Sequence, residues 1–177
     1  MRQIVTIPML IISIIATSPL GGLTQSAPSD GRETLTRALR GAWVPLESGL
    51  AVSTGEGTPV SAKYEIDDGA FQLSVYTWKV DAYAGDSSAE VIVDHNTGSV
   101  TRVDTITDGG DLAAALSQKA AMAVAKRSLA EATAAAVKRN AGYRAVSAMP
   151  SLDGGRPVAE VILVRGDDWK VVTERLD

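Results

Sequence analysis

His95 is the only histidine of the chain, so a search for catalytic or metal-binding chemistry begins there. It follows Asp94 and opens the segment His-Asn-Thr-Gly, which is typical of a turn. With Asp94 and Asp104 it would offer a metal one imidazole and two carboxylates, which falls short of a zinc ligand set. The chain also lacks a His-Glu-x-x-His motif. We therefore interpret His95 as a solvated turn residue.

Two pairs of adjacent aspartates, Asp67–Asp68 and Asp167–Asp168, could share a proton or bind calcium. Calcium takes six to eight oxygens, and no Asp-x-Asp-x-Asp-Gly loop is present. Both pairs stand where the chain is expected to turn, which explains them without a ligand. Nucleophilic catalysis is equally poorly supported, because there is no cysteine and no Gly-x-Ser-x-Gly motif. We predict no catalytic residue, no metal and no cofactor.

Three aromatic residues are the candidates for contact with a protein partner: Tyr76, Trp78 and Tyr83. They lie on the polar side of an expected hairpin and in its loop, and aromatic side chains often anchor interfaces. The alternative is that an alanine-rich helix covers them. Lys138, Arg139 and Arg144 form a small basic group, which we interpret as the solvated end of that helix.

Apolar and polar residues alternate in two regions of the chain, and a period of two predicts strands. In the first region, Val60, Ala62, Tyr64 and Ile66 are expected on one buried face. A glycine turn at 67–69 leads to a return strand, a third strand follows at 90–94, and 100–103 leads out. The second region repeats the pattern with strands at 146–152, 158–164 and 169–174.

Helices are expected before each group of strands. Short helices are predicted at 33–41 and 45–51, after a linker at 27–31. Residues 112–141 contain 13 alanines and favour a helix, with Asp111 as the N-cap. Ser128 and Glu131 form a capping box inside this segment, so we expect a bend near Ser128 and leave the continuity of helix 111–141 open.

The two strand regions align with each other at an offset of 86 residues, which matches 60–77 to 146–163. Val-Ser-Ala opens both segments, and Asp67, Gly69 and Val75 recur as Asp153, Gly155 and Val161. Because the turn residues and the strand phase agree together, we favour an internal duplication over a chance likeness of two hairpins.

The segments PVSAKYEIDDGAFQLSVYT and AEVIVDHNTGSV resemble a PepSY domain, most clearly in the closing Val-Asp-x-x-Thr-Gly-x-Val. The second half is similar but lacks the Asp-x-x-Thr-Gly turn. The resemblance covers roughly residues 44–175 and extends to the small exported PepSY proteins of Gram-negative bacteria. It implies a non-enzymatic module of the cell envelope, able to restrain or inhibit a peptidase, and it carries no catalytic residues.

The N-terminus predicts export. Arg2 precedes an apolar run from Ile4 to Ile15, and small residues follow, as in a secretory signal. Cleavage is expected between Ser26 and Ala27; an uncleaved membrane anchor is the alternative. The net charge of -4 on 177 residues argues against nucleic acid as a partner, since such binding needs clustered positive charge.

Together these patterns predict an α+β fold: two repeats of a helix plus a three-stranded antiparallel sheet, joined by an Ala-rich helix. The predicted organisation is a signal peptide at 1–26, a linker and short helix at 27–43, a first PepSY-like unit at 44–106, a connecting helix at 107–127 and a degenerate second unit at 128–177. The expected function is a periplasmic binding module with an unknown protein partner, for which the resemblance suggests a peptidase, and no membrane span after signal cleavage. A self-associating structural protein and a carboxylate- or His95-based enzyme are the alternatives.

Overall fold

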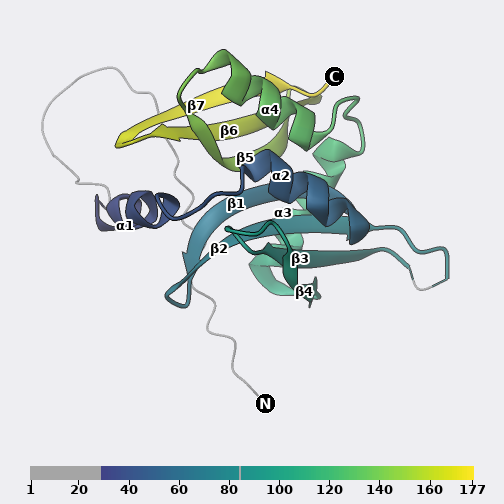
Figure 1. The fold of residues 1–177 in the computed structure, drawn as a ribbon. Coiled ribbons are helices and arrows are strands. Elements are labelled where there is room, and N and C mark those ends of the chain that lie inside the picture. The colour runs from purple at the N-terminus through teal and green to yellow at the C-terminus, as the bar shows by residue number, and fades with distance from the viewer. Residues whose placement is uncertain (1–28, 84) are drawn as a thin grey trace, which may run out of the picture.

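The computed structural model describes residues 29–83 and 85–177, which form an antiparallel sheet with helices on both faces (Figure 1). This arrangement confirms the predicted α+β class. The α-helices are α1 (Ser29–Leu39), α2 (Leu46–Val52), α3 (Gly109–Met122) and α4 (Leu129–Arg139), and a 3-10 turn follows α2 at Ser53–Gly55. The strands are β1 (Thr58–Asp67), β2 (Ala70–Lys79), β3 (Ser87–Val93), β4 (Val100–Ile106), β5 (Arg144–Asp153), β6 (Arg156–Arg165) and β7 (Asp168–Arg175). The predicted signal peptide and its cleavage point lie outside the described residues.

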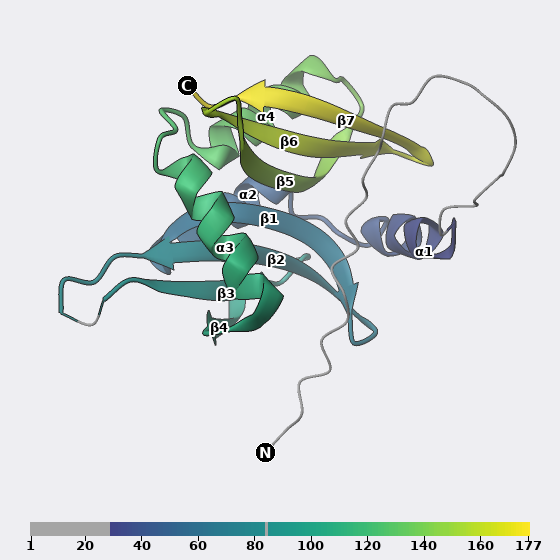
Figure 2. The same cartoon turned by 180° about the vertical axis from the view of Figure 1, so that it is seen from behind.

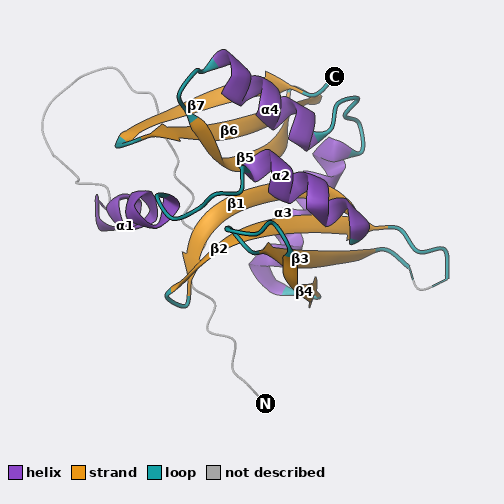
Figure 3. Cartoon of the chain, viewed as in Figure 1, coloured by secondary structure: helices purple, strands orange, loops and turns teal. Residues whose placement is uncertain are grey.

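All seven of these strands belong to one sheet, in the order β4-β3-β2-β1-β5-β6-β7 (Figure 3). The two central strands are joined by a short pairing, Ala62 with Ala148 and Lys63 with Ser147. The prediction of two three-stranded sheets is corrected in two ways. The strands merge into one sheet, and the first half supplies four of them, because Val100–Ile106 pairs with β3 instead of leading out.

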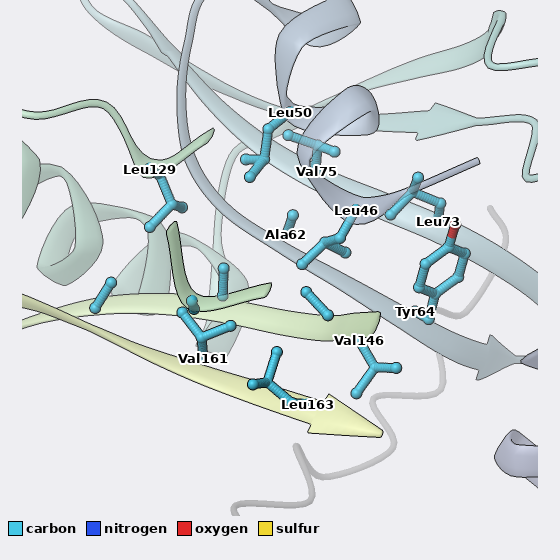
Figure 4. Close-up of a cluster of buried hydrophobic side chains, with 14 of the residues drawn as sticks. Leu46, Leu50, Ala62, Tyr64, Leu73, Val75, Leu129, Val146, Val161 and Leu163 are labelled. Carbon is cyan, nitrogen blue, oxygen red and sulfur yellow. The ribbon is translucent and has the colours of Figure 1, made fainter. Parts of the chain in front are cut away.

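The helices cover the two faces unequally. Helices α2 and α4 lie together on one face, whereas α3 crosses the other, as the two opposite views show (Figures 1 and 2). The main core lies between α2, α4 and the sheet, where leucines and valines from both halves meet (Figure 4). Gly49 lets α2 approach β2 closely, since a Cβ atom there would lie 2.4 Å from Cδ2 of Leu73.

The predicted hairpin turns are confirmed, but the strand before the first one is irregular. Asp68 and Gly69 both have positive φ, as a two-residue type I′ turn requires. The β1–β2 register shifts by one residue between Pro59 and Ser61, so Val60 is an extra residue on β1. This bulge turns Val60 toward the α3 side, away from Ala62 and Tyr64, and Ile66 is exposed. The expectation that all four share one buried face is therefore wrong.

The alanine-rich segment is divided into two helices. Helix α3 ends at Met122, before the predicted limit of 127, and α4 begins at Leu129. Between them, the backbone N–H groups of Lys126 and Arg127 donate to the carbonyl of Leu176, which fixes the break against the C-terminal segment. The capping box of Ser128 and Glu131 is confirmed, so the local signal correctly marked where the second helix starts.

Two helix starts differ from the prediction. Asp108 rather than Asp111 is the N-cap of α3, which places Asp111 in its first turn. Helix α1 begins at Ser29, inside the segment that was predicted to be a linker.

Candidate functional site

The face of β2 that carries Tyr76 and Trp78 lies beneath α3. These side chains are only 8% and 9% exposed and pack with Val60 and Ala115. The Tyr76 hydroxyl donates to Oδ1 of Asp111 at 2.8 Å, so the helix is bonded to the strand as well as packed on it. The alanine-rich helix α3 therefore covers the rings of Tyr76 and Trp78, as in the alternative to a partner-binding surface. Tyr83 is fully exposed in the β2–β3 loop, so the three candidates do not form one surface.

The contact between α3 and the sheet contains polar groups that are left without partners. Nζ of Lys119 lies 3.5 Å from the centre of the Trp78 ring and 2.7 Å from Oδ2 of Asp86. Among the described buried side chains, the polar atoms without a hydrogen bond are Trp78 Nε1, Ser88 Oγ and Gln118 Oε1, and all three belong to α3 or to strands of the sheet that it crosses. A buried, unpaired polar atom costs about 1–3 kcal/mol. The polar atoms between α3 and the sheet therefore have fewer hydrogen-bond partners than they need, in contrast to the apolar main core.

A polar network occupies the same face of β1, β2 and β3. The Ser74 hydroxyl donates to Oε1 of Glu90 at 2.5 Å, and Lys63 pairs with Glu65 at 2.5 Å. Burial raises the pKa of Glu90, while the hydrogen bond from Ser74 acts against that rise. A carboxyl group with a raised pKa can serve as a general acid. Ser74, however, is fully buried, so a substrate could not reach its hydroxyl, and the network stabilises the fold rather than forming a catalytic pair.

The turn that contains His95 positions a neighbouring segment. The carboxylate of Asp94 accepts hydrogen bonds from the backbone N–H groups of Asn96 and Thr97, and these bonds lower its pKa. The backbone carbonyl of His95 accepts from the N–H groups of Trp43 and Val44, and its ring packs 4.8 Å from that of Phe71. His95 is thus half-buried rather than fully solvated. In the described part of the chain, no group of three or more His, Asp or Glu side chains could hold a metal ion.

Trp43, which the sequence analysis did not select, lies next to this turn. Its backbone N–H donates to the carbonyl of His95, and its side chain is 81% exposed. An exposed tryptophan is a common anchor of protein interfaces. No periodic pattern marks Trp43, because it lies in the connection between α1 and α2; its residue type was the only signal available.

Strand β4 is one edge of the sheet and presents a mostly exposed row of side chains. Among the strands of residues 29–83 and 85–177, it pairs with β3 alone, and residues 101–105 are exposed. Its two charged residues, Arg102 and Asp104, pair with each other at 2.6 Å. The opposite edge, β7, carries more charge, with Asp168, Lys170, Glu174 and Arg175. Charged side chains discourage edge pairing, so β4 is the edge better suited to accept another strand.

No family model, curated protein or solved structure that was compared with the chain matches it. Of the helices in residues 29–83 and 85–177, none combines the length and the apolar character needed to cross a bilayer.

Proposed function

We propose that the chain is an exported, non-enzymatic binding module of two PepSY-like units, which binds an extended segment of a protein partner along β4. The observation that carries the proposal is the unpaired, weakly charged edge of β4. Extended peptides add to such edges by main-chain hydrogen bonds, and the side chains on either face give specificity. A peptidase is the partner class that the PepSY resemblance implies, and a periplasmic location fits the predicted signal peptide.

The proposal of two units is supported by the pairing of the hairpins. Ser61 faces Tyr76 in the first hairpin, and the residues 86 positions later, Ser147 and Ile162, face each other in the second. The extra residue Val60 likewise has a counterpart, because the β5–β6 register shifts between Ala145 and Ser147.

The contact between the hairpins supports the same proposal. Ala62 pairs with Ala148, which is its own counterpart at the offset of 86 residues. When equivalent residues pair in antiparallel strands, an approximate twofold axis runs between them. Homodimers with a twofold axis meet through the same patch of both copies, and a duplicated chain can preserve that contact.

The β4 edge can be tested with a matched pair of exposed valines. Val103 on β4 is 43% exposed and Val171 on β7 is 39% exposed. A photo-reactive p-benzoylphenylalanine at position 103 should form an adduct with a second protein in intact cells, whereas the same residue at position 171 should not. In a chain without the photo-reactive residue, Val103→Lys should prevent that partner from co-purifying with the chain, because a charge on the edge opposes strand addition. Equal adducts at both positions, or none at 103, would overturn the proposal.

The same experiment separates the alternatives. An adduct at position 103 that contains only a second copy of the chain would favour a self-associating structural protein. If the captured partner is a peptidase, the purified mature chain should slow the hydrolysis of a peptide by that peptidase. The His95→Ala variant of the chain should inhibit the peptidase to the same extent. Turnover of a substrate by the chain itself, lost in His95→Ala, would favour an enzyme and contradict the proposal.

A further inference from the structure

A groove lined by arginines lies between α1 and the loops at one end of β5, β6 and β7. It consists of two adjoining depressions, of about 450 and 250 Å³, which share Thr36 and Arg40. We call it the arginine groove; its lining includes Arg37, Arg40, Tyr143, Arg144, Arg165 and Asp167. β4 and the arginine groove belong to opposite ends of the strand order, so this groove is separate from the proposed peptide edge.

Two of the four arginines are fixed by the fold. Arg144 donates to the carbonyls of Leu39 and Ala42 at 3.0 and 2.8 Å and to that of Val44 at 3.2 Å, which holds the end of α1 against β5. Arg165 lies 4.5 Å from the centre of the Tyr143 ring and 3.3 Å from Oδ2 of Asp168. These contacts place the guanidinium groups of Arg144 and Arg165 at the groove, the first within the fold and the second in an exposed ion pair.

The other two arginines remain available. Arg37 lies in the last turn of α1, and Arg40 directly follows the helix, where its backbone N–H donates to the carbonyl of Arg37 at 3.3 Å. Both residues line the smaller depression. Both are exposed, and within the described part of the chain neither guanidinium has a hydrogen-bonding or ion-pairing partner. A guanidinium group matches a carboxylate in shape and can bind it through two parallel hydrogen bonds.

The charge of the groove stands out from that of the whole molecule. Four arginines line it against two acidic residues, Glu33 and Asp167, whereas the chain as a whole has a net charge of -4. Because the net charge is negative, an acidic segment should bind at this groove rather than elsewhere on the surface. The groove is open to solvent and bordered by exposed side chains such as Arg37, Arg40 and Arg165, which suits a segment of a protein better than an enclosed small molecule.

We propose that the arginine groove binds an acidic segment of a protein, with Asp or Glu carboxylates of that segment on Arg37 and Arg40. The probe is a fluorescein-labelled hexaglutamate peptide, whose binding to the full mature chain is followed by fluorescence anisotropy at low ionic strength. Arg40→Gln should weaken binding about fivefold to tenfold, and the double variant Arg37→Gln/Arg40→Gln about thirtyfold or more, as expected for charge-assisted pairs.

The matched control is Arg156→Gln, which makes the same change in charge. Arg156 is exposed and begins β6 at the opposite end of the β5–β6 hairpin, where it pairs with Asp153. This variant should bind the peptide as the unchanged chain does. Circular dichroism should show that all variants are folded, since Arg37 and Arg40 make no contact that the fold needs. The proposal is overturned if the peptide does not bind, or if Arg156→Gln weakens binding as much as Arg40→Gln.

Discussion

The clearest quantitative prediction concerns Arg144, whose guanidinium donates to three backbone carbonyls of the segment 39–44. Its cation also lies 5.3 Å from the centre of the Tyr64 ring, and the Tyr64 hydroxyl donates to the carbonyl of Val44. Arg144→Met keeps the apolar stem but removes every donor. A hydrogen bond to a charged group contributes about 1.5–3 kcal/mol, but the carbonyls of this half-buried site can partly turn to water. We therefore expect a total loss of about 3 kcal/mol in the free energy of unfolding, and a Tm lower by about 10 °C.

Urea unfolding followed by circular dichroism measures this loss, and hydrogen exchange locates it. Residues 39–44 should exchange faster in Arg144→Met than in the unchanged chain, because their carbonyl anchors are gone. Arg144→Lys should restore little, since an ammonium group cannot reach three carbonyls in the planar way that a guanidinium does. The control is Arg102→Met, which breaks an exposed ion pair and should cost less than about 1 kcal/mol. A loss below that control, or unchanged exchange at 39–44, would refute the role assigned to Arg144.

Two further predictions concern the sheet. Burial holds the pKa of Glu90 above its ordinary value of 4.5, so the folded state retains the proton longer than the unfolded state. The unchanged chain should therefore lose more stability than Glu90→Gln as the pH rises from about 4 to neutral. The urea midpoint of unfolding, measured at each pH, tests this. Parallel plots of midpoint against pH for the two proteins would contradict it. Gly57 has a φ of +143°, and a Cβ there would lie 2.8 Å from the carbonyl oxygen of Trp78. Gly57→Ala should lower the free energy of unfolding by about 2–3 kcal/mol, measured by thermal unfolding. The control Gly69→Ala should lower it by about 1 kcal/mol, because a Cβ atom at Gly69 meets open space. Equal losses would contradict the clash at Gly57.

The features that could be predicted from the sequence are those set by residues close together in the chain. The turn at 67–69 follows from aspartate and glycine residues that accept positive φ, and the start of α4 follows from the capping box at Ser128. The alternation in β2 correctly separated Leu73 and Val75, which face α2 and α4, from Tyr76 and Trp78 on the opposite face. These features depend on backbone geometry within a few residues.

The candidate site was harder to predict, because it depends on which layer covers each face. Alternation in β2 marked the Tyr76 side as polar, but the pattern could not decide whether water, a partner or α3 would cover it. Trp43 carried no periodic signal at all. Arg144 looked like the solvated end of a basic helix, since the carbonyls that it binds are about 100 residues earlier in the chain.

By itself, the sequence determined the α+β composition, the hairpin turns, the capping box at Ser128 and the similarity of residues 60–77 to 146–163. Only the tertiary structure decided that the strands join into one sheet, that α3 covers Tyr76 and Trp78, and that Arg144 anchors α1. The physical reason is the range of the forces involved. Turns and caps are fixed by local sterics and hydrogen bonds, whereas the pairing of β1 with β5 and the burial of a face depend on contacts between residues that are distant in the sequence.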